Sequence, residues 1–131
     1  ITAIYPSRHW SLLIPTYDIL TFDDALAVRQ QLLDAWTPTG WPPEAGNPAY
    51  TFITEYLPIA ERDGYLLVAD LRPGKNRGQI LEFDKVDADD GTMNWPSLRV
   101  LLHKLATAVE DRRPFNDWQP DFDDGVLRWN L

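Results

Sequence analysis

The sequence predicts an α+β fold: an antiparallel, mainly meander sheet with its helices packed on one side. Two segments, 22–36 and 98–109, repeat apolar residues at helical spacing. Between them, residues 56–84 hold three short apolar segments separated by turn residues, which is the pattern of consecutive antiparallel strands. Helices that flank a run of strands, instead of alternating with them, are expected to bury their apolar stripes against one side of the sheet.

The first predicted helix opens after Thr21 and ends before Pro38. The Thr21 hydroxyl can accept a hydrogen bond from a free backbone N–H, and the acidic residues Asp23 and Asp24 suit the positive end of a helix. Upstream, residues 1–20 predict loops and a short strand near 17–20. The apolar stripe of the helix consists of Phe22, Ala25, Val28, Leu32 and Trp36.

Residues 37–48 contain four prolines and two glycines, so this segment predicts a loop or a meandering connection. Trp41 lies within it. We interpret Trp41 as an anchor that packs the connection onto the core. The alternative is an exposed tryptophan that binds a partner.

The three predicted strands span residues 56–60, 65–70 and 79–84. Asp63-Gly64 separates the first two and favours a tight type I′ turn. The middle strand is almost continuously apolar, so it should be central and covered on both faces. Pro58 lacks a backbone donor, which places the first strand at an edge of the sheet or at the beginning of the strand.

Beyond the strands, the sequence predicts an acidic loop over 87–94, a second helix and a short terminal strand over 126–129. Ser97 caps the helix, which stops at Pro114. Asp123-Asp124-Gly125 predicts the turn before the terminal strand.

Composition bounds the function. A chain of 131 residues fits one domain, 1–131, and it contains no cysteine, which is consistent with the cytoplasm. The formal charge of -8 disfavours nucleic acid and anionic membranes and favours a basic protein partner, although acidity can also serve solubility alone. No apolar run is long enough to span a bilayer, and no secretory signal is visible. Ile1 is not an initiator residue, so we expect further residues upstream.

The residue types needed for catalysis are sparse. Only His9 and His103 could act as a histidine base, and no Gly-x-Ser-x-Gly motif supports a nucleophile. The acidic run 87–91 resembles a calcium loop, but its glycine falls one place early and Leu98 stands where the final glutamate ligand belongs. We therefore predict no metal, no cofactor and no enzymatic activity. An acid hydrolase remains an alternative, because two facing carboxylates would suffice for one.

The turn over 72–78 carries three cations and two glycines. These residues allow a phosphate site, but a strand follows them, so no helix N-terminus is available to receive a phosphate. We interpret the turn as a solvated hairpin tip whose cations form a local positive patch.

The order of motifs along residues 15–112 resembles the SUKH family, the Smi–Knr cell-wall-assembly-regulator group. The resemblance begins at the helix opening 20–25 and continues through the strands and their turns. Two departures stand out: a tyrosine replaces the family's usual tryptophan at the first strand, and the family's N-terminal helices are not in this chain. The matching positions, mainly structural in the family, are Tyr56, Pro58, Asp63, Gly64, Asp70, Pro73, Gly74, Gly78 and Gln79.

The resemblance implies protein binding. Many bacterial members look like immunity proteins that neutralise a toxin, so we expect a stoichiometric inhibitor of a basic toxin domain. The alternative is a regulatory or scaffolding module of a larger protein, as in the fungal relatives. The oligomeric state is not predicted. The candidate contact residues, which could equally be solvated surface, are Asp87, Asp89, Asp90, Trp118, Asp121, Asp123 and Asp124.

Overall fold

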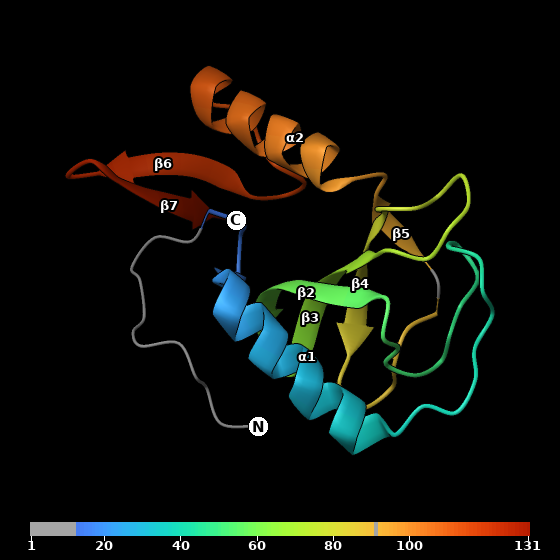
Figure 1. Cartoon of the computed structure of the whole chain (residues 1–131). Coiled ribbons are helices and arrows are strands. Elements are labelled where there is room, and N and C mark those ends of the chain that lie inside the picture. Colours follow the sequence, from blue (N-terminus) through green and yellow to red (C-terminus); the bar gives the residue numbers. More distant parts are fainter. Residues whose placement is uncertain (1–12, 91) are drawn as a thin grey trace.

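A five-stranded antiparallel sheet organises residues 13–90 and 92–131, the part of the chain that this computed structural model describes (Figure 1). Its strands follow one another in chain order, so the predicted α+β class and meander are confirmed. They are β1 (Asp18–Ile19), β2 (Tyr56–Arg62), β3 (Tyr65–Asp70), β4 (Ile80–Asp84) and β5 (Met93–Trp95). The other elements are α1 (Phe22–Trp36), α2 (Leu98–Asp111) and a separate hairpin of β6 (Gln119–Asp123) and β7 (Val126–Asn130).

The central strand β3 divides its side chains between two buried layers. Leu66 and Val68 belong to one apolar cluster, whereas Leu67 and Ala69 belong to another. Because successive side chains of a strand point to opposite faces, the two clusters lie on opposite faces of the sheet. The prediction that this strand is covered on both faces is confirmed.

The two helices cover opposite faces, which corrects the prediction that both pack on one side. α1 buries Leu32 in the cluster that contains Leu66, and α2 buries Leu101 and Leu105 in the cluster that contains Leu67. In Figure 1, α1 (blue) lies beside the central strands, and α2 (orange) lies apart from it, next to the β6–β7 hairpin. The physical reason is the apolar character of β3 on both faces, since each face then needs its own cover.

Both helices begin at the predicted caps. The Oγ1 of Thr21 accepts a hydrogen bond from the N–H of Asp24 at 3.1 Å. The Oγ of Ser97 accepts one from the N–H of Val100, also at 3.1 Å. Each cap satisfies a backbone donor that has no partner within the helix.

The connection between α1 and β2 is anchored by aromatic packing. Trp41 packs against the α1 side of the core, and its Nε1 donates to Glu55 Oε2 at 3.4 Å. The anchor interpretation of Trp41 is therefore confirmed. Nearby, the rings of Phe52 and Phe83 meet edge to face at 5.3 Å, which closes the same core.

β2 lies between β1 and β3, yet it behaves as an edge at Pro58. β1 is two residues long and pairs only with Ala60 and Glu61. At Pro58 no described strand pairs with β2 on the β1 side, and the register with β3 shifts between Pro58 and Ala60. A proline is tolerated at such a position because it interrupts no ladder on the open side.

Two strands go beyond the sequence prediction. β5 lies within the predicted acidic loop, and β6 precedes the predicted terminal turn. β6 forms by pairing with β7, and the turn between them places Asp124 at φ 51° and Gly125 at φ 77°. Within the described residues, neither helix combines the length and apolar character that a membrane crossing requires.

Candidate functional site

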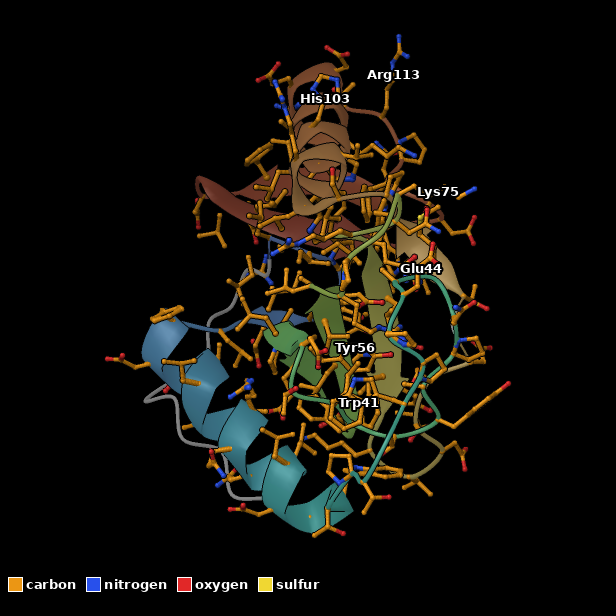
Figure 2. The ribbon with its side chains drawn as sticks, turned by 45° about the vertical axis from the view of Figure 1, so that its right-hand side comes forward. Trp41, Glu44, Tyr56, Lys75, His103 and Arg113 are labelled. Atoms are coloured by element: carbon orange, nitrogen blue, oxygen red, sulfur yellow. The ribbon has the colours of Figure 1, made fainter. Side chains whose placement is uncertain are left out.

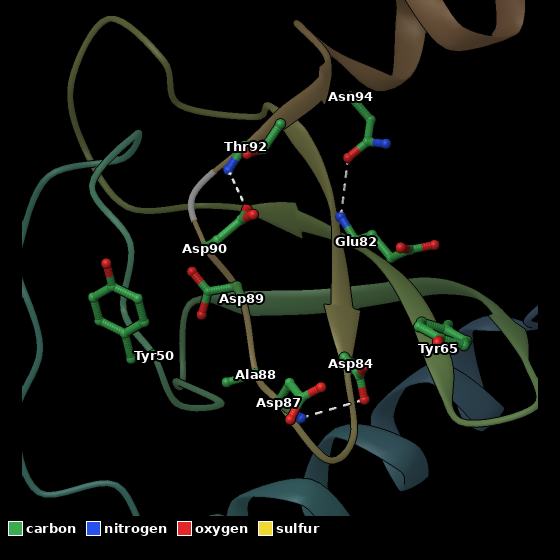
Figure 3. Close-up of a pocket in the computed structure, with 10 residues that line it drawn as sticks. All are labelled: Tyr50, Tyr65, Glu82, Asp84, Asp87, Ala88, Asp89, Asp90, Thr92 and Asn94. Atoms are coloured by element: carbon green, nitrogen blue, oxygen red, sulfur yellow. Dashed lines mark hydrogen bonds between the residues drawn. The ribbon is translucent and has the colours of Figure 1, made fainter.

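A groove of about 410 Å³ opens beside the second half of β4, where the loop between β4 and β5 leaves the sheet (Figure 3). We call it the acidic groove, because its lining among the described residues includes five carboxylates and no lysine, arginine or histidine. Tyr50 and Tyr65 lie on either side of these carboxylates in Figure 3. The lining residues are Tyr50, Tyr65, Glu82, Asp84, Asp87, Ala88, Asp89, Asp90, Thr92 and Asn94.

The groove exists because β5 covers only the first half of β4. β5 pairs with Ile80 and Leu81 of β4 and does not extend along the rest of that strand. The backbone N–H of Glu82 donates instead to the side-chain Oδ1 of Asn94 at 3.2 Å, and this bond is drawn in Figure 3. Beyond it, the backbone of Asp84 bonds in both directions to Ala88, at 3.0 and 2.8 Å, so the loop closes on the strand it has just left.

The acidic loop is held by its own carboxylates. Asp84 Oδ1 accepts hydrogen bonds from the N–H groups of Val86 and Asp87, at 2.8 and 3.3 Å. Asp90 Oδ1 accepts one from the N–H of Thr92 at 2.9 Å. The backbone and hydroxyl of Thr92 stabilise the charged form and lower the pKa of Asp90, so this exposed carboxylate stays ionised. The groove thus presents preformed negative charge.

One carboxylate of the groove, Glu82, already has a cationic partner. Glu82 accepts a hydrogen bond from the hydroxyl of Tyr17 and pairs with Arg62 at 3.5 Å. The guanidinium of Arg62 also lies over the ring of Tyr65, at 4.6 Å from its centroid. The carboxylates of Asp84 and Asp90 accept hydrogen bonds from backbone N–H groups, and Asp87 is exposed, so these three supply most of the available charge.

Tyr50 contributes an aromatic ring to the rim of the groove. Its side chain is 66% exposed, and its backbone has φ 56°, in the left-handed region. A bulky residue in that region is uncommon and costs of the order of 1–2 kcal/mol. Strained, exposed residues of this kind cluster at functional sites. Sequence reasoning missed Tyr50, because it follows a loop alanine and belongs to no apolar repeat.

Asp89 is buried, and this corrects its assignment as an exposed contact residue. It is 3% exposed, and its Oδ2 accepts a hydrogen bond from the N–H of Ala49 at 3.0 Å. Burial and then the charge of Asp89 raise the pKa of Tyr56, which therefore stays neutral. Asp89 ties the acidic loop to the connection before β2. Asp87 and Asp90 are exposed, as predicted.

The residues that carry the family resemblance form structure and not the groove. Asp70 and Arg72 are fully buried and joined by an ion pair of 2.7 Å. Gln79 Nε2 donates to the same carboxylate at 3.2 Å. Arg72 also donates to the backbone oxygens of Pro42 and Asn47, at 2.9 and 2.8 Å, so it clamps the proline-rich connection onto the sheet.

The turn over 72–78 is present, but its predicted patch of three cations is reduced to Lys75 and Arg77, because Arg72 is buried. Its backbone closes against the connection: Ala45 N–H donates to Pro73 O at 3.0 Å. At Gly74, with φ 119°, an added Cβ would lie 2.7 Å from the Cγ of Glu44, so the close approach requires glycine.

The remaining predicted turn residues are also structural. Gly78 has φ 89° and donates its N–H to Asp70 O at 2.7 Å. Asp63 and Gly64 have φ values of 34° and 89°, the positive values that a type I′ turn requires.

The predicted contact residues of the tail lie elsewhere. Asp121, Asp123 and Asp124 are exposed on the β6–β7 hairpin, and Asp123 pairs with Arg128 at 3.5 Å. Trp118 is half-buried and bridges through its backbone to Phe115. β7 lies near β5, because the ring of Phe115 contacts both Trp95 of β5, at 5.8 Å, and Trp129 of β7, at 6.0 Å, but none of these four tail residues is among the described lining residues of the groove. The structure therefore brings Asp87 and Asp90 together in the groove and separates them from the tail.

Among residues 13–90 and 92–131, no three acidic or histidine side chains form a group that could hold a metal ion. His103 lines a different hollow, beside the end of α2, and His9 lies outside the described residues. Comparison with protein-family models, with curated proteins and with solved structures finds no match to this chain.

Proposed function

We propose that this domain is a non-enzymatic protein-binding module that engages a basic partner through the acidic groove. The observation that carries the proposal is the lining of the groove: among the described residues it holds the carboxylates of Asp84, Asp87 and Asp90, no cationic side chain, and an exposed, strained tyrosine at the rim. Fixed negative charge would steer a basic partner and set its orientation. The ring of Tyr50, beside the carboxylates, would receive the guanidinium of an arginine or the ammonium of a lysine over its face.

In its most concrete form, the proposal is a cytoplasmic immunity protein that neutralises a basic toxin domain by occupying it. The resemblance to SUKH domains and the formal charge of -8 support this version. Exposed groups such as Asp87 and Asp90 would speed association, and Tyr50 would supply buried area once the partner is bound. The protein would act stoichiometrically.

The test is a titration with the purified protein encoded by the adjacent gene, using two double variants of equal charge. Asp87→Asn with Asp90→Asn removes two charges from the groove, and Asp121→Asn with Asp124→Asn removes two from the hairpin. We expect the groove variant to weaken binding about tenfold at low salt and the hairpin variant to change it little. Calorimetry at low and high salt measures both.

Two outcomes would count against the proposal. If the hairpin variant alone weakens binding, the acidic tail is the contact surface and the groove is not. If the neighbouring protein neither binds at low salt nor arrests growth when it is expressed without this domain, the immunity role is wrong.

A further inference from the structure

A second groove, of about 360 Å³, lies at the far end of α2, and its lining has the opposite charge. Among the described residues, a histidine, a lysine and an arginine line it, and no carboxylate does. We call it the cationic groove. Its lining residues are His103, Lys104, Thr107, Ala108, Arg113, Pro114, Phe115 and Asn116.

The turn after α2 assembles this groove. The helix ends at Asp111, and Arg112 follows in the left-handed region with φ 55°. The N–H of Arg113 then donates to Ala108 O at 2.9 Å, which folds the chain back toward the helix. Figure 2 shows His103 and Arg113 at the same end of the molecule. The floor is apolar, because Ala108 and Phe115 are both buried.

The basic side chains of this groove have no acidic partner in the described part of the chain. The ion pairs there engage Arg62, Arg72, Lys85 and Arg128. None involves His103, Lys104 or Arg113, although the chain holds 20 acidic residues against 12 lysines and arginines. Other described cations, such as Lys75 and Arg77, also have no ion pair, so what distinguishes this groove is that its basic side chains gather beside a buried apolar floor.

The helix dipole does not explain the positions of His103 and Lys104. It favours cations only within the last turn of a helix. His103 and Lys104 lie two turns before the end of α2 at Asp111. The dipole therefore gives no reason for basic residues at these two positions.

We propose that the cationic groove binds an acidic peptide segment of a protein partner. Carboxylates of the segment would pair with Lys104 and Arg113, and an adjacent apolar side chain would lie on the floor formed by Ala108 and Phe115. Charge complementarity and the apolar floor favour such a peptide over a free phosphate, which has no apolar part to place there. The surface differs in charge and in place from the acidic groove and does not depend on it.

The test titrates the full chain with an acetylated Glu-Glu-Leu-Glu-Glu peptide. Two-dimensional amide NMR of the protein monitors the binding. We expect shifts confined to residues 103–108 and 113–116, with a dissociation constant on the order of 1 mM. Lys104→Gln with Arg113→Gln should weaken binding about tenfold. The matched variant, Lys75→Gln with Arg77→Gln, removes two exposed cations from the turn after β3 and should bind as the wild type does.

Four results would overturn the inference: no shifts at all, equal loss in both double variants, equal shifts with a Gln-Gln-Leu-Gln-Gln peptide, or saturation of the groove by inorganic phosphate alone. Salt-sensitive self-association abolished by the Lys104 and Arg113 substitutions would also overturn it, because the occupant would then be an acidic surface of a second copy. The acidic-groove variant, Asp87→Asn with Asp90→Asn, should leave binding of the peptide to the cationic groove unchanged. Failure of this inference is thereby distinguished from failure of the proposed function.

Discussion

Arg72 shows how one buried side chain positions a whole segment. Its guanidinium meets the carboxylate of Asp70 at 2.7 and 3.0 Å and reaches two backbone oxygens of the proline-rich connection. A connection rich in proline has few backbone donors of its own, so its carbonyls need donors from elsewhere. Arg72 provides these donors. Tyr50 follows the segment that Arg72 holds, and it lines one side of the acidic groove.

Replacing Arg72 should destabilise the proline-rich connection and, with it, the side of the acidic groove that Tyr50 lines. We predict that Arg72→Met lowers the free energy of unfolding by about 3–5 kcal/mol, because Asp70 would be left charged and unpaired in the interior. Urea denaturation followed by circular dichroism measures the change. Arg77→Met, the same substitution at an exposed site of the same turn, should alter stability by less than about 0.5 kcal/mol. Equal effects in the two variants would show that the clamp adds nothing.

Tyr50 should show opposite effects on stability and on binding. Glycine adopts φ 56° without a steric penalty, although it adds entropy to the unfolded chain. We therefore predict that Tyr50→Gly stabilises the protein by about 0.5–1 kcal/mol in urea denaturation. The same variant should weaken partner binding in the titration described above. A loss of stability would mean that the ring supports the fold and is not held in place for a partner.

At the scale of elements, the sequence predicted those whose signals are local. Capping residues and apolar repeats located α1 and α2, and Asp63-Gly64 located the β2–β3 turn. β5 and β6 were missed because their pairing, not their composition, forms them. β5 has only three residues, and β6 contains Pro120 and two aspartates.

The placement of the helices depended on information from both faces of one strand. The apolar run of β3 indicated cover on both faces, whereas the order of elements suggested helices on one side. The structure follows the strand, since Leu66 and Leu67 face different helices. A buried strand therefore predicts helix placement better than element order does in this protein.

The candidate site was predicted only in part, for a related reason. Charge density along the chain located the acidic loop, and Asp87 and Asp90 do line the groove. Charge density could not separate these two from Asp89, which accepts a hydrogen bond in the interior. Nor could it bring in Tyr50, Tyr65 or Glu82, because their proximity arises from the pairing of β4 and the path of the connection.

At the scale of the whole molecule, the charges are segregated as well as unbalanced. The acidic groove gathers carboxylates beside β4, and the cationic groove gathers basic side chains beyond α2. With a net charge of -8, the acidic surface repels itself in the free protein, and a basic partner would relieve that repulsion. Binding and folding should consequently respond to salt in opposite directions.

We predict that raising sodium chloride from about 10 mM to about 300 mM increases the free energy of unfolding by about 1 kcal/mol, because screening shortens the range of repulsion among the carboxylates. Over the same range, the affinity for a basic partner should fall. Asp87→Asn with Asp90→Asn should flatten the salt dependence of the affinity, while Asp121→Asn with Asp124→Asn should preserve it. Urea denaturation and calorimetry at matched salt concentrations measure the two responses. A stability of the wild type that is independent of salt would contradict the repulsion, and an affinity that is independent of salt would remove the electrostatic basis of partner attraction.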